Sequence, residues 1–168
     1  MSIPITNQRI YNLQKYMIKR HNMNPNGVIG VGFLFCGIGL PYLYNFVQEE
    51  KGMKPEMISG KEIIKKALEG DFLAKEVFDL FLKLLGLTIH QLCACFVPNN
   101  GVVLCGNILM SAKKLLIEDI SKGPEKSILK KSFYNSGSLA EFNKSIPFYF
   151  CEIKELGLRG CFVSFAFC

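Results

Sequence analysis

Histidine is scarce in this chain, and the cysteine spacing of a typical metal site is missing. The 168 residues contain two histidines, His21 and His90, and seven cysteines, no two of them in a Cys-x-x-Cys spacing. Zinc sites usually combine cysteines at such spacings with histidines close by in the sequence. We therefore expect no zinc or other metal site, and free, mostly buried thiols of the kind found in the cytoplasm.

Dense clusters of one charge are also lacking. The formal net charge is +6, but the basic residues are spread as pairs, such as Lys65-Lys66, Lys113-Lys114 and Lys130-Lys131, with no aromatic residues between them. Pairs of this kind are typical of solvated helix faces, whereas a nucleic-acid surface would need them to converge on one face. We therefore expect no nucleic-acid partner.

Segments that would direct the chain to a membrane are not evident. The first 16 residues, MSIPITNQRIYNLQKY, do not show a basic region followed by the apolar run of a secretory signal. The last nine residues, GCFVSFAFC, are apolar but far short of the about 20 needed to span a bilayer. These features predict a cytoplasmic protein without a membrane partner.

Apolar residues make up 49% of the chain, which is enough for a buried core in one domain or in part of a larger one. Helical spacing predicts a surface helix over residues 7–21 and a second helix capped by Ser59. The longest helical pattern covers residues 71–96, and its apolar second half predicts burial. Gly86 lies inside that pattern, where glycine costs about 1 kcal/mol relative to alanine, so it indicates the close approach of another backbone.

Strand patterns are fewer than helical ones. An extended apolar run covers residues 28–36, and clear strands are predicted over 102–105 and 146–153. Further helices are predicted over residues 108–120, 138–145 and 155–168, and a polar segment without an element over 123–138. Because helices separate the strands, the fold class is α/β, with few parallel strands and several covering helices. A parallel sheet this small indicates part of a larger fold or pairing with another chain.

The strand over residues 102–105 ends at a bare corner. Gly106 and Asn107 follow it and open a helix. In parallel α/β sheets, ligands lie beyond the carboxyl ends of strands, where glycine lets a ligand approach the backbone. A ligand site and a tight turn without a ligand both fit this local pattern. The Gly37-Ile38-Gly39 corner lacks a third glycine, which favours a turn alone.

Four segments, in order along nearly the whole chain, resemble bacterial-type glucokinases. Residues 36–44, CGIGLPYLY, are similar to Ser-Gly-x-Gly-Leu-x-x-x-Tyr, and residues 67–86 to an Ala-x-x-Gly-Asp-x-x-Ala run that leads into a long helix. Residues 100–108, NGVVLCGNI, resemble Gly-Gly-Val-x-Ile-Ala-Gly-Gly-Ile. Residues 145–160 resemble an Ile-Pro-Val-Tyr segment followed by Gly-Leu-x-Gly. None of these motifs is specific alone, but four of them in the family's order and spacing are specific.

The resemblance implies that residues 1–168 form one partial domain, similar to the C-terminal half of a protein of the actin-like, ribonuclease-H-like ATPase superfamily. It implies ATP with Mg²⁺ as cofactor, and ATP and glucose as partners in the glycolytic transfer of a phosphoryl group to glucose. The family's Asp-Gly-Gly-Thr phosphate loop and catalytic aspartate belong to its first half. We therefore expect no catalytic residue or metal ligand here, and a chain that is inactive alone. The resemblance assigns nucleotide binding to Gly106, Asn107 and Gly101, with adenosine against the corner.

Two positions depart from the family pattern. Asn107 stands where the family has the second glycine of the pair, and asparagine tolerates left-handed geometry. Gly32 stands where the family has a sugar-binding glutamate, so no sugar-binding residue is assigned; losing such a charged partner costs about 1.5 to 3 kcal/mol.

An alternative function is a truncated or degenerate, non-catalytic relative that acts as a binding or scaffold module. Such a protein would bind a partner through the surface that its other half would cover. Uncovered sheet edges and apolar faces also predict self-association or a homodimer.

Overall fold

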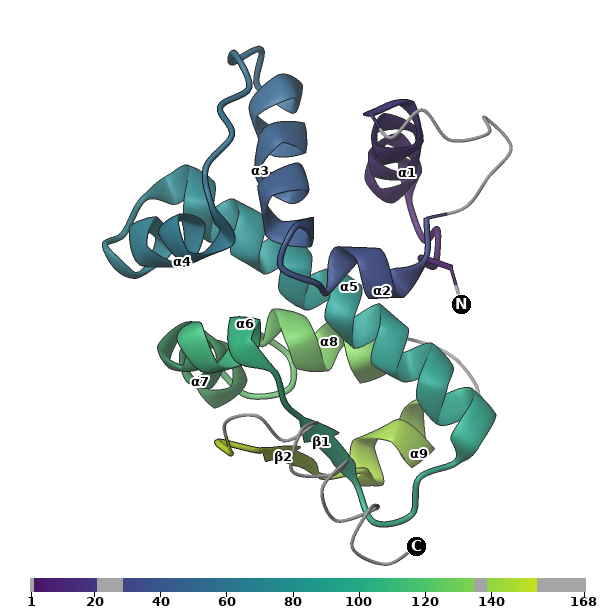
Figure 1. Ribbon diagram of the computed structural model, residues 1–168. Helices are drawn as coiled ribbons and strands as arrows, with labels where there is room; N and C mark the ends of the chain where they lie inside the picture. Colours follow the sequence, from purple (N-terminus) through teal and green to yellow (C-terminus); the bar gives the residue numbers. More distant parts are fainter. Residues whose placement is uncertain (1, 21–28, 135–138, 154–168) are drawn as a thin grey trace, which may run out of the picture.

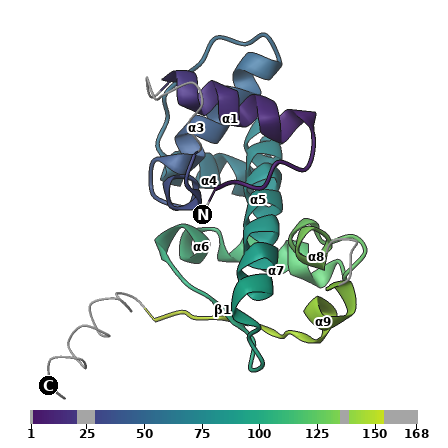
Figure 2. The same ribbon diagram turned by 90° about the vertical axis from the view of Figure 1, so that its right-hand side faces the viewer.

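One long central helix organises the molecule. The computed structural model describes residues 2–20, 29–134 and 139–153. The central helix α5 (Phe72–Phe96) packs against α3, α4 and α8. In Figure 1, α1, α2 and α3 lie above it and α6–α9 with the sheet lie below it, and Figure 2 shows the same two groups in the upper and lower parts of the view. The remaining helices are α1 (Gln8–Arg20), α2 (Val31–Leu34), α3 (Gly39–Glu50), α4 (Gly60–Leu68), α6 (Asn107–Ser111), α7 (Lys113–Ser121), α8 (Ile128–Tyr134) and α9 (Ala140–Ser145).

Side-chain caps fix the starts of four helices, including α1, where the Asn7 side-chain oxygen accepts a hydrogen bond from the Ile10 N–H at 3.0 Å. The Ser59 hydroxyl accepts a hydrogen bond from the Glu62 N–H at 3.2 Å, and the Asp71 carboxylate accepts one from the Ala74 N–H at 2.7 Å. Both caps confirm the predicted helix starts, since each supplies a partner for an otherwise unpaired N–H group. The buried Asp119 carboxylate does the same for α8, where it accepts bonds from the Ile128 N–H at 2.8 Å and the Leu129 N–H at 3.1 Å.

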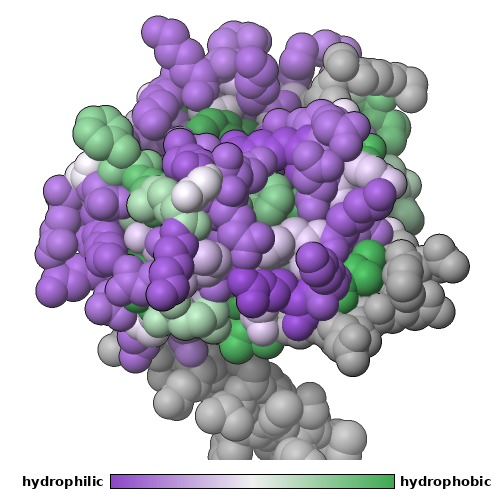
Figure 3. All heavy atoms as spheres, turned by 90° about the horizontal axis from the view of Figure 1, so that it is seen from above, coloured by the Kyte–Doolittle hydropathy of each residue, from purple (hydrophilic) through white to green (hydrophobic). Residues whose placement is uncertain are grey.

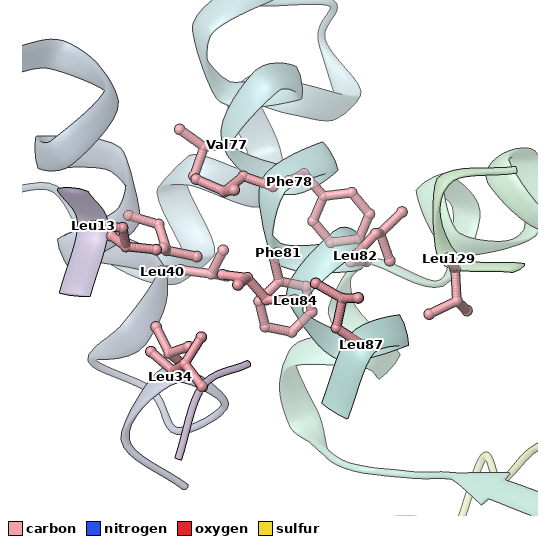
Figure 4. Close-up of a cluster of buried hydrophobic side chains, with 14 of the residues drawn as sticks. Leu13, Leu34, Leu40, Val77, Phe78, Phe81, Leu82, Leu84, Leu87 and Leu129 are labelled. Atoms are coloured by element: carbon pink, nitrogen blue, oxygen red, sulfur yellow. The ribbon is translucent and has the colours of Figure 1, made fainter. Parts of the chain in front are cut away.

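The core gathers on α5. Apolar side chains from α1, α2, α3 and α8 meet those of α5 in Figure 4, and the buried ones include Leu13, Leu34, Leu40, Val77, Phe78, Phe81, Leu82, Leu84, Leu87 and Leu129. Phe81 lies at the centre, with its ring 5.4 Å from that of Phe35 and 5.8 Å from that of Phe78. The central helix therefore joins both ends of the molecule through one hydrophobic cluster.

Gly86 confirms the predicted close approach. A Cβ atom at this position would lie 2.5 Å from the Leu129 carbonyl oxygen and 3.0 Å from the Phe133 backbone nitrogen. Both are backbone atoms of α8. Glycine at position 86 is thus what allows α5 and α8 to pack at this distance.

Among the described helices, α5 is long and apolar enough to cross a membrane by length and composition alone, and 67% of its most apolar window is buried inside the molecule. That burial is typical of a core helix. The predicted burial of its whole second half is wrong, however. Ile89 is buried, but the last turn projects from the molecule, and Phe96 is 75% exposed.

The described residues form one small parallel sheet. Strand β1 (Val102–Leu104) pairs with β2 (Phe148–Phe150), with Val103 opposite Tyr149 and Leu104 opposite Phe150. Leu104 is buried, while Val103 is 58% and Tyr149 53% exposed, so one face of the pair is open. The predicted α/β class with parallel pairing is confirmed, although the second strand is shorter than the predicted 146–153.

The predicted extended run over residues 28–36 is wrong, since its described part contains the helical turn α2. The Phe33 N–H bonds the Gly30 carbonyl at 3.1 Å, and the Phe35 N–H bonds the Val31 carbonyl at 3.3 Å. Among the residues that the structure describes, this run pairs with no strand beyond an isolated bridge between Ser2 and Gly30. Local bonds therefore satisfy the backbone groups that a sheet would otherwise pair.

Two helical predictions also change. The helix predicted over 108–120 is divided at Ala112, whose ψ of 13° interrupts it between α6 and α7. The segment predicted as polar and without an element contains α8, which buries Leu129 and Phe133 against α5. The helix predicted over 155–168 lies outside the described residues.

Charged side chains cover the end of the molecule that holds α1 and α3, where Figure 3 shows a largely hydrophilic surface. Arg9 of α1 contacts Glu50 at 2.8 Å and Glu76 of α5 at 2.7 Å, and Lys51 contacts Glu76 at 2.9 Å. These ion pairs connect α1, the end of α3 and α5. The hydrogen bond from Lys51 contributes most to lowering the pKa of Glu76; burial opposes this, and Arg9 lowers the pKa further.

Candidate functional site

Gly106 forms a corner that other residues do not readily adopt. It lies between β1 and α6, with φ at 119° and ψ at 156°, and its carbonyl accepts the first helical bond of α6 from the Met110 N–H at 2.9 Å. That backbone region is essentially restricted to glycine. A Cβ atom added there would meet no other atom within 4 Å, so the space over the corner is open. The glycine therefore serves the turn and also leaves its backbone accessible.

The corner opens onto a cavity of about 510 Å³, a volume within the usual range for small-molecule sites. Gly106 and Asn107 line it on one side, Gly32 and Gly37 on another, and Phe81 of α5 contributes to its wall. The structure thus brings together two glycine corners that lie about 70 residues apart in the sequence. The lining is mostly apolar, which suits a flat apolar ring better than a phosphate group.

A second, smaller cavity of about 290 Å³ is also lined by Asn107. Gly37 and Asn107 line both cavities, and the start of α4 contributes Ser59, Gly60 and Lys61 to the smaller one. Lys61 and Asn107 both line this smaller cavity. Because α6 has only five residues, its dipole is weaker than that of the uninterrupted helix that the sequence predicts.

Gly101, the third residue predicted to bind nucleotide, lies at the opposite end of β1. Five residues of extended chain place it about 16 Å from Gly106, and it lines neither of the two cavities. A Cβ atom at position 101 would lie 2.7 Å from the Pro147 carbonyl oxygen and 2.6 Å from a ring carbon of Tyr149. Glycine at 101 thus permits the close pairing of β1 and β2, and the structure does not bring it to the corner.

Gly32, where the resemblance predicts that the family has a sugar-binding glutamate, lies in α2 at the larger cavity. An added Cβ atom would meet nothing within 4 Å, so the position has room for a side chain. No aspartate or glutamate of the described residues lines either cavity beside the corner.

The described residues also form no cluster of three or more potential metal ligands. Of the two histidines, His21 lies outside the described residues, and the His90 Nδ1 atom lies 3.0 Å from the Phe133 carbonyl oxygen. Mg²⁺ is usually held by one or two carboxylates together with phosphate oxygens. The described linings of the two cavities offer no carboxylate, so they do not fit the ion and we assign no chemical step to it.

Sequence patterns missed the side chains that α5 contributes to the larger cavity. Phe81, Leu85, Thr88 and Ile89 line it together with the corner. Their helical spacing marks one apolar face, but it does not tell a wall of a cavity from an ordinary core. The contribution of Lys61 to the smaller cavity likewise depends on a contact between α4 and α6 that only the fold reveals.

Comparison with known proteins supports the resemblance. A family model described as glucokinase matches residues 1–166. The glucokinase of Neisseria meningitidis serogroup B is 26% identical over 145 residues, which cover 86% of this chain and 42% of that protein. The glucokinase of Rhizobium etli is 29% identical over 135 residues, which cover 80% of this chain and 37% of that protein.

A solved structure shares the fold. The crystal structure of a glucokinase from an Antarctic psychrotroph matches all of this chain and 48% of its own, with a TM-score of 0.79 at 18% identity. The chain thus spans less than half the length of the curated relatives it matches. The family model, which covers nearly every residue, shows that the chain belongs to the glucokinase family.

Proposed function

We propose that this chain supplies the adenosine side of the ATP site in a glucokinase-type sugar kinase. The whole enzyme would transfer the γ-phosphoryl group of ATP to glucose, as a step of glycolysis in the cytoplasm. Membership in the family supports this function, and one observation carries the assignment of the site. Gly106 presents a bare backbone corner to a cavity large enough for a nucleoside.

The chemistry of the lining limits what this part of the protein can contribute. The apolar wall with Phe81 and the bare corner can hold an adenine ring and exclude water from it. General-base catalysis on a sugar hydroxyl needs a carboxylate or a histidine in reach of it. Neither cavity holds one among the described residues. We therefore propose that residues 1–168 form one partial domain and that the catalytic and sugar-binding groups lie outside it.

A second candidate function is a non-catalytic module that binds a protein partner. The open face of the two-stranded sheet favours it, because Val103 and Tyr149 expose more than half of their surface side by side. The two functions differ in nucleotide binding: a part of a sugar kinase must bind ATP, whereas a protein-binding module need not.

Titration of ATP distinguishes them. With the phosphate-binding groups elsewhere, we expect a Kd in the millimolar range, about −4 kcal/mol, measured by saturation-transfer NMR on the ATP protons. Asn107→Phe places a ring between the two cavities and should weaken binding at least about tenfold. Asn107→Gly restores the glycine pair and should leave binding unchanged or tighten it.

A matched control is available on α7. Ile117 is 50% exposed and lines neither cavity beside the corner, so Ile117→Phe adds an aromatic ring without changing the site. If Asn107→Phe binds ATP as well as Ile117→Phe does, the corner is only a turn. A coupled assay with glucose and ATP should detect no turnover by the 168-residue chain alone, and clear turnover would refute the proposed division of catalytic groups.

A further inference from the structure

Two cysteines occupy facing positions where the strands end. Leu104 of β1 lies opposite Phe150 of β2, so the next residues in the same register are Cys105 and Cys151. The Cys151 N–H donates to the Leu104 carbonyl at 2.9 Å, which keeps the pairing to this point. Neighbouring strands lie about 4.8 Å apart, and the Cα atoms of a disulfide lie about 4.4 to 6.8 Å apart. The backbone spacing therefore suits a disulfide.

Both side chains belong to the same face of the sheet. Residues along a strand alternate between faces, so Cys105 shares the face of Val103, and Cys151 shares that of Tyr149. Val103 and Tyr149 are exposed, and so is Cys105, while Cys151 is half-buried and both cysteines are free thiols. The expectation of mostly buried thiols is wrong for the described cysteines, since Cys93 alone among them is buried and Cys95 and Cys105 are exposed. An oxidant in solution can reach this pair, whereas Cys93 is buried within the core.

An ion pair holds the end of β2 in place. Lys113 at the start of α7 contacts Glu152, the residue after Cys151, at 2.5 Å. Cys151 thus bonds the last residue of β1 through its own N–H, and the residue after it contacts the start of α7. This restraint keeps the two thiols together, and such proximity greatly favours an intramolecular reaction over one between molecules.

We infer that Cys105 and Cys151 form a vicinal dithiol that a peroxide oxidises to an intramolecular disulfide. The exposed Cys105 sulfur attacks one oxygen of hydrogen peroxide, the O–O bond breaks, and a sulfenic acid and water form. The Cys151 sulfur then attacks the sulfenic sulfur, the S–O bond breaks, the S–S bond forms, and a second water leaves. Two thiols are oxidised by two electrons, and one peroxide is reduced to two waters.

The modification site borders the candidate functional site. Cys105 directly precedes Gly106 and lines the cavity of about 510 Å³. A disulfide would connect the corner covalently to β2. The inference itself depends only on the register of β1 and β2, so it can be tested whether or not the chain binds nucleotide.

Peptide mapping tests the inference on the full chain. The reduced protein is treated with an equimolar amount of hydrogen peroxide, its remaining thiols are alkylated, and it is digested with trypsin without reduction. We expect the peptide of residues 145–154, which contains Cys151, linked to that of residues 84–113 in monomeric protein. Fragmentation of the linked pair should place the bond at Cys105 rather than at Cys93 or Cys95, which share its peptide.

Three substitutions sharpen the assignment. Cys105→Ser should reduce the linked peptide by at least about tenfold, and Cys151→Ser should abolish it, because residues 145–154 then contain no thiol. Cys95→Ser is the matched control, because Cys95 is exposed and free but lies on α5, and it should leave the yield unchanged. A bond from Cys151 to Cys93 or Cys95, a bond between two molecules, or peroxide oxidation that stops at sulfinic acid on Cys105 would overturn the inference. The wild-type fragmentation pattern decides the matter even if a variant fails to fold.

Discussion

Replacing Gly86 with alanine tests the packing on which the fold depends. The added Cβ atom would lie 2.5 Å from the Leu129 carbonyl oxygen and 2.8 Å from the Ser132 Cβ atom, well inside ordinary contact distance. The helices α5 and α8 cannot easily move apart from each other, because Leu129 and Phe133 are fully buried between them. Overlap with backbone atoms puts the cost of overpacking in the upper part of its usual range, at about 2 to 3 kcal/mol, and alanine recovers about 1 kcal/mol of helix propensity. We expect the free energy of unfolding to fall by about 1 to 2 kcal/mol.

Urea unfolding followed by circular dichroism measures this change, and Gly60→Ala is its control. Gly60 is also helical, but a Cβ atom there would lie 3.5 Å or more from its nearest neighbours. Alanine at 60 should therefore leave the stability unchanged or raise it by up to about 1 kcal/mol. If Gly86→Ala is as stable as the wild type, or if both variants gain equally, the close contact between α5 and α8 does not exist.

Three further predictions concern stability and association. Asp119→Ala removes the buried cap of α8 and should lower the free energy of unfolding by about 1 to 3 kcal/mol in urea, whereas a value equal to the wild type would refute the capping role. The pKa of Glu76 lies below its ordinary value of 4.5, so its ion pairs stabilise the fold above that pH, and this stabilisation is lost as the pH falls through the lowered pKa. In urea unfolding, Glu76→Gln should therefore be less stable than the wild type at neutral pH but not in strong acid. An equal difference in stability at the two pH values would contradict this pH dependence. Sedimentation velocity should show self-association that decreases on dilution, since the sheet face is open, and a monomer at every concentration would contradict it.

Local rules predict the parts of the fold that local interactions decide. Asp71 and Ser59 have the side chains that cap helices, and both do so. Gly86 stands inside a helix, where a residue of higher helix propensity is expected, and this glycine correctly indicates the close approach of another backbone. The two strands are recognisable because unbroken apolar runs of β-branched and aromatic residues are typical of parallel strands, although one face of this pair is open.

Other parts depend on contacts that the sequence does not display. The apolar run before Gly37 has the composition of a strand, but without a partner strand it forms the short helix α2. Leu129 and Phe133 lie four residues apart, as they would on one face of a helix. The helix α8 that they belong to is short and lies in a mostly polar segment, so the pattern is easily missed. The cavity at the corner needs Gly32, Phe81 and Gly106 to meet, and only the packing around α5 brings them together.

The most direct test of the central claim is a map of where ATP binds. Amide shifts of the ¹⁵N-labelled chain are followed while ATP is added into the millimolar range. The account predicts the largest shifts at Gly106 and Asn107, smaller ones at Gly32 and Gly37 across the cavity, and none at Gly101, which lies at the far end of β1. Shifts that cluster away from the corner, or none at concentrations well above the expected Kd, would contradict the account.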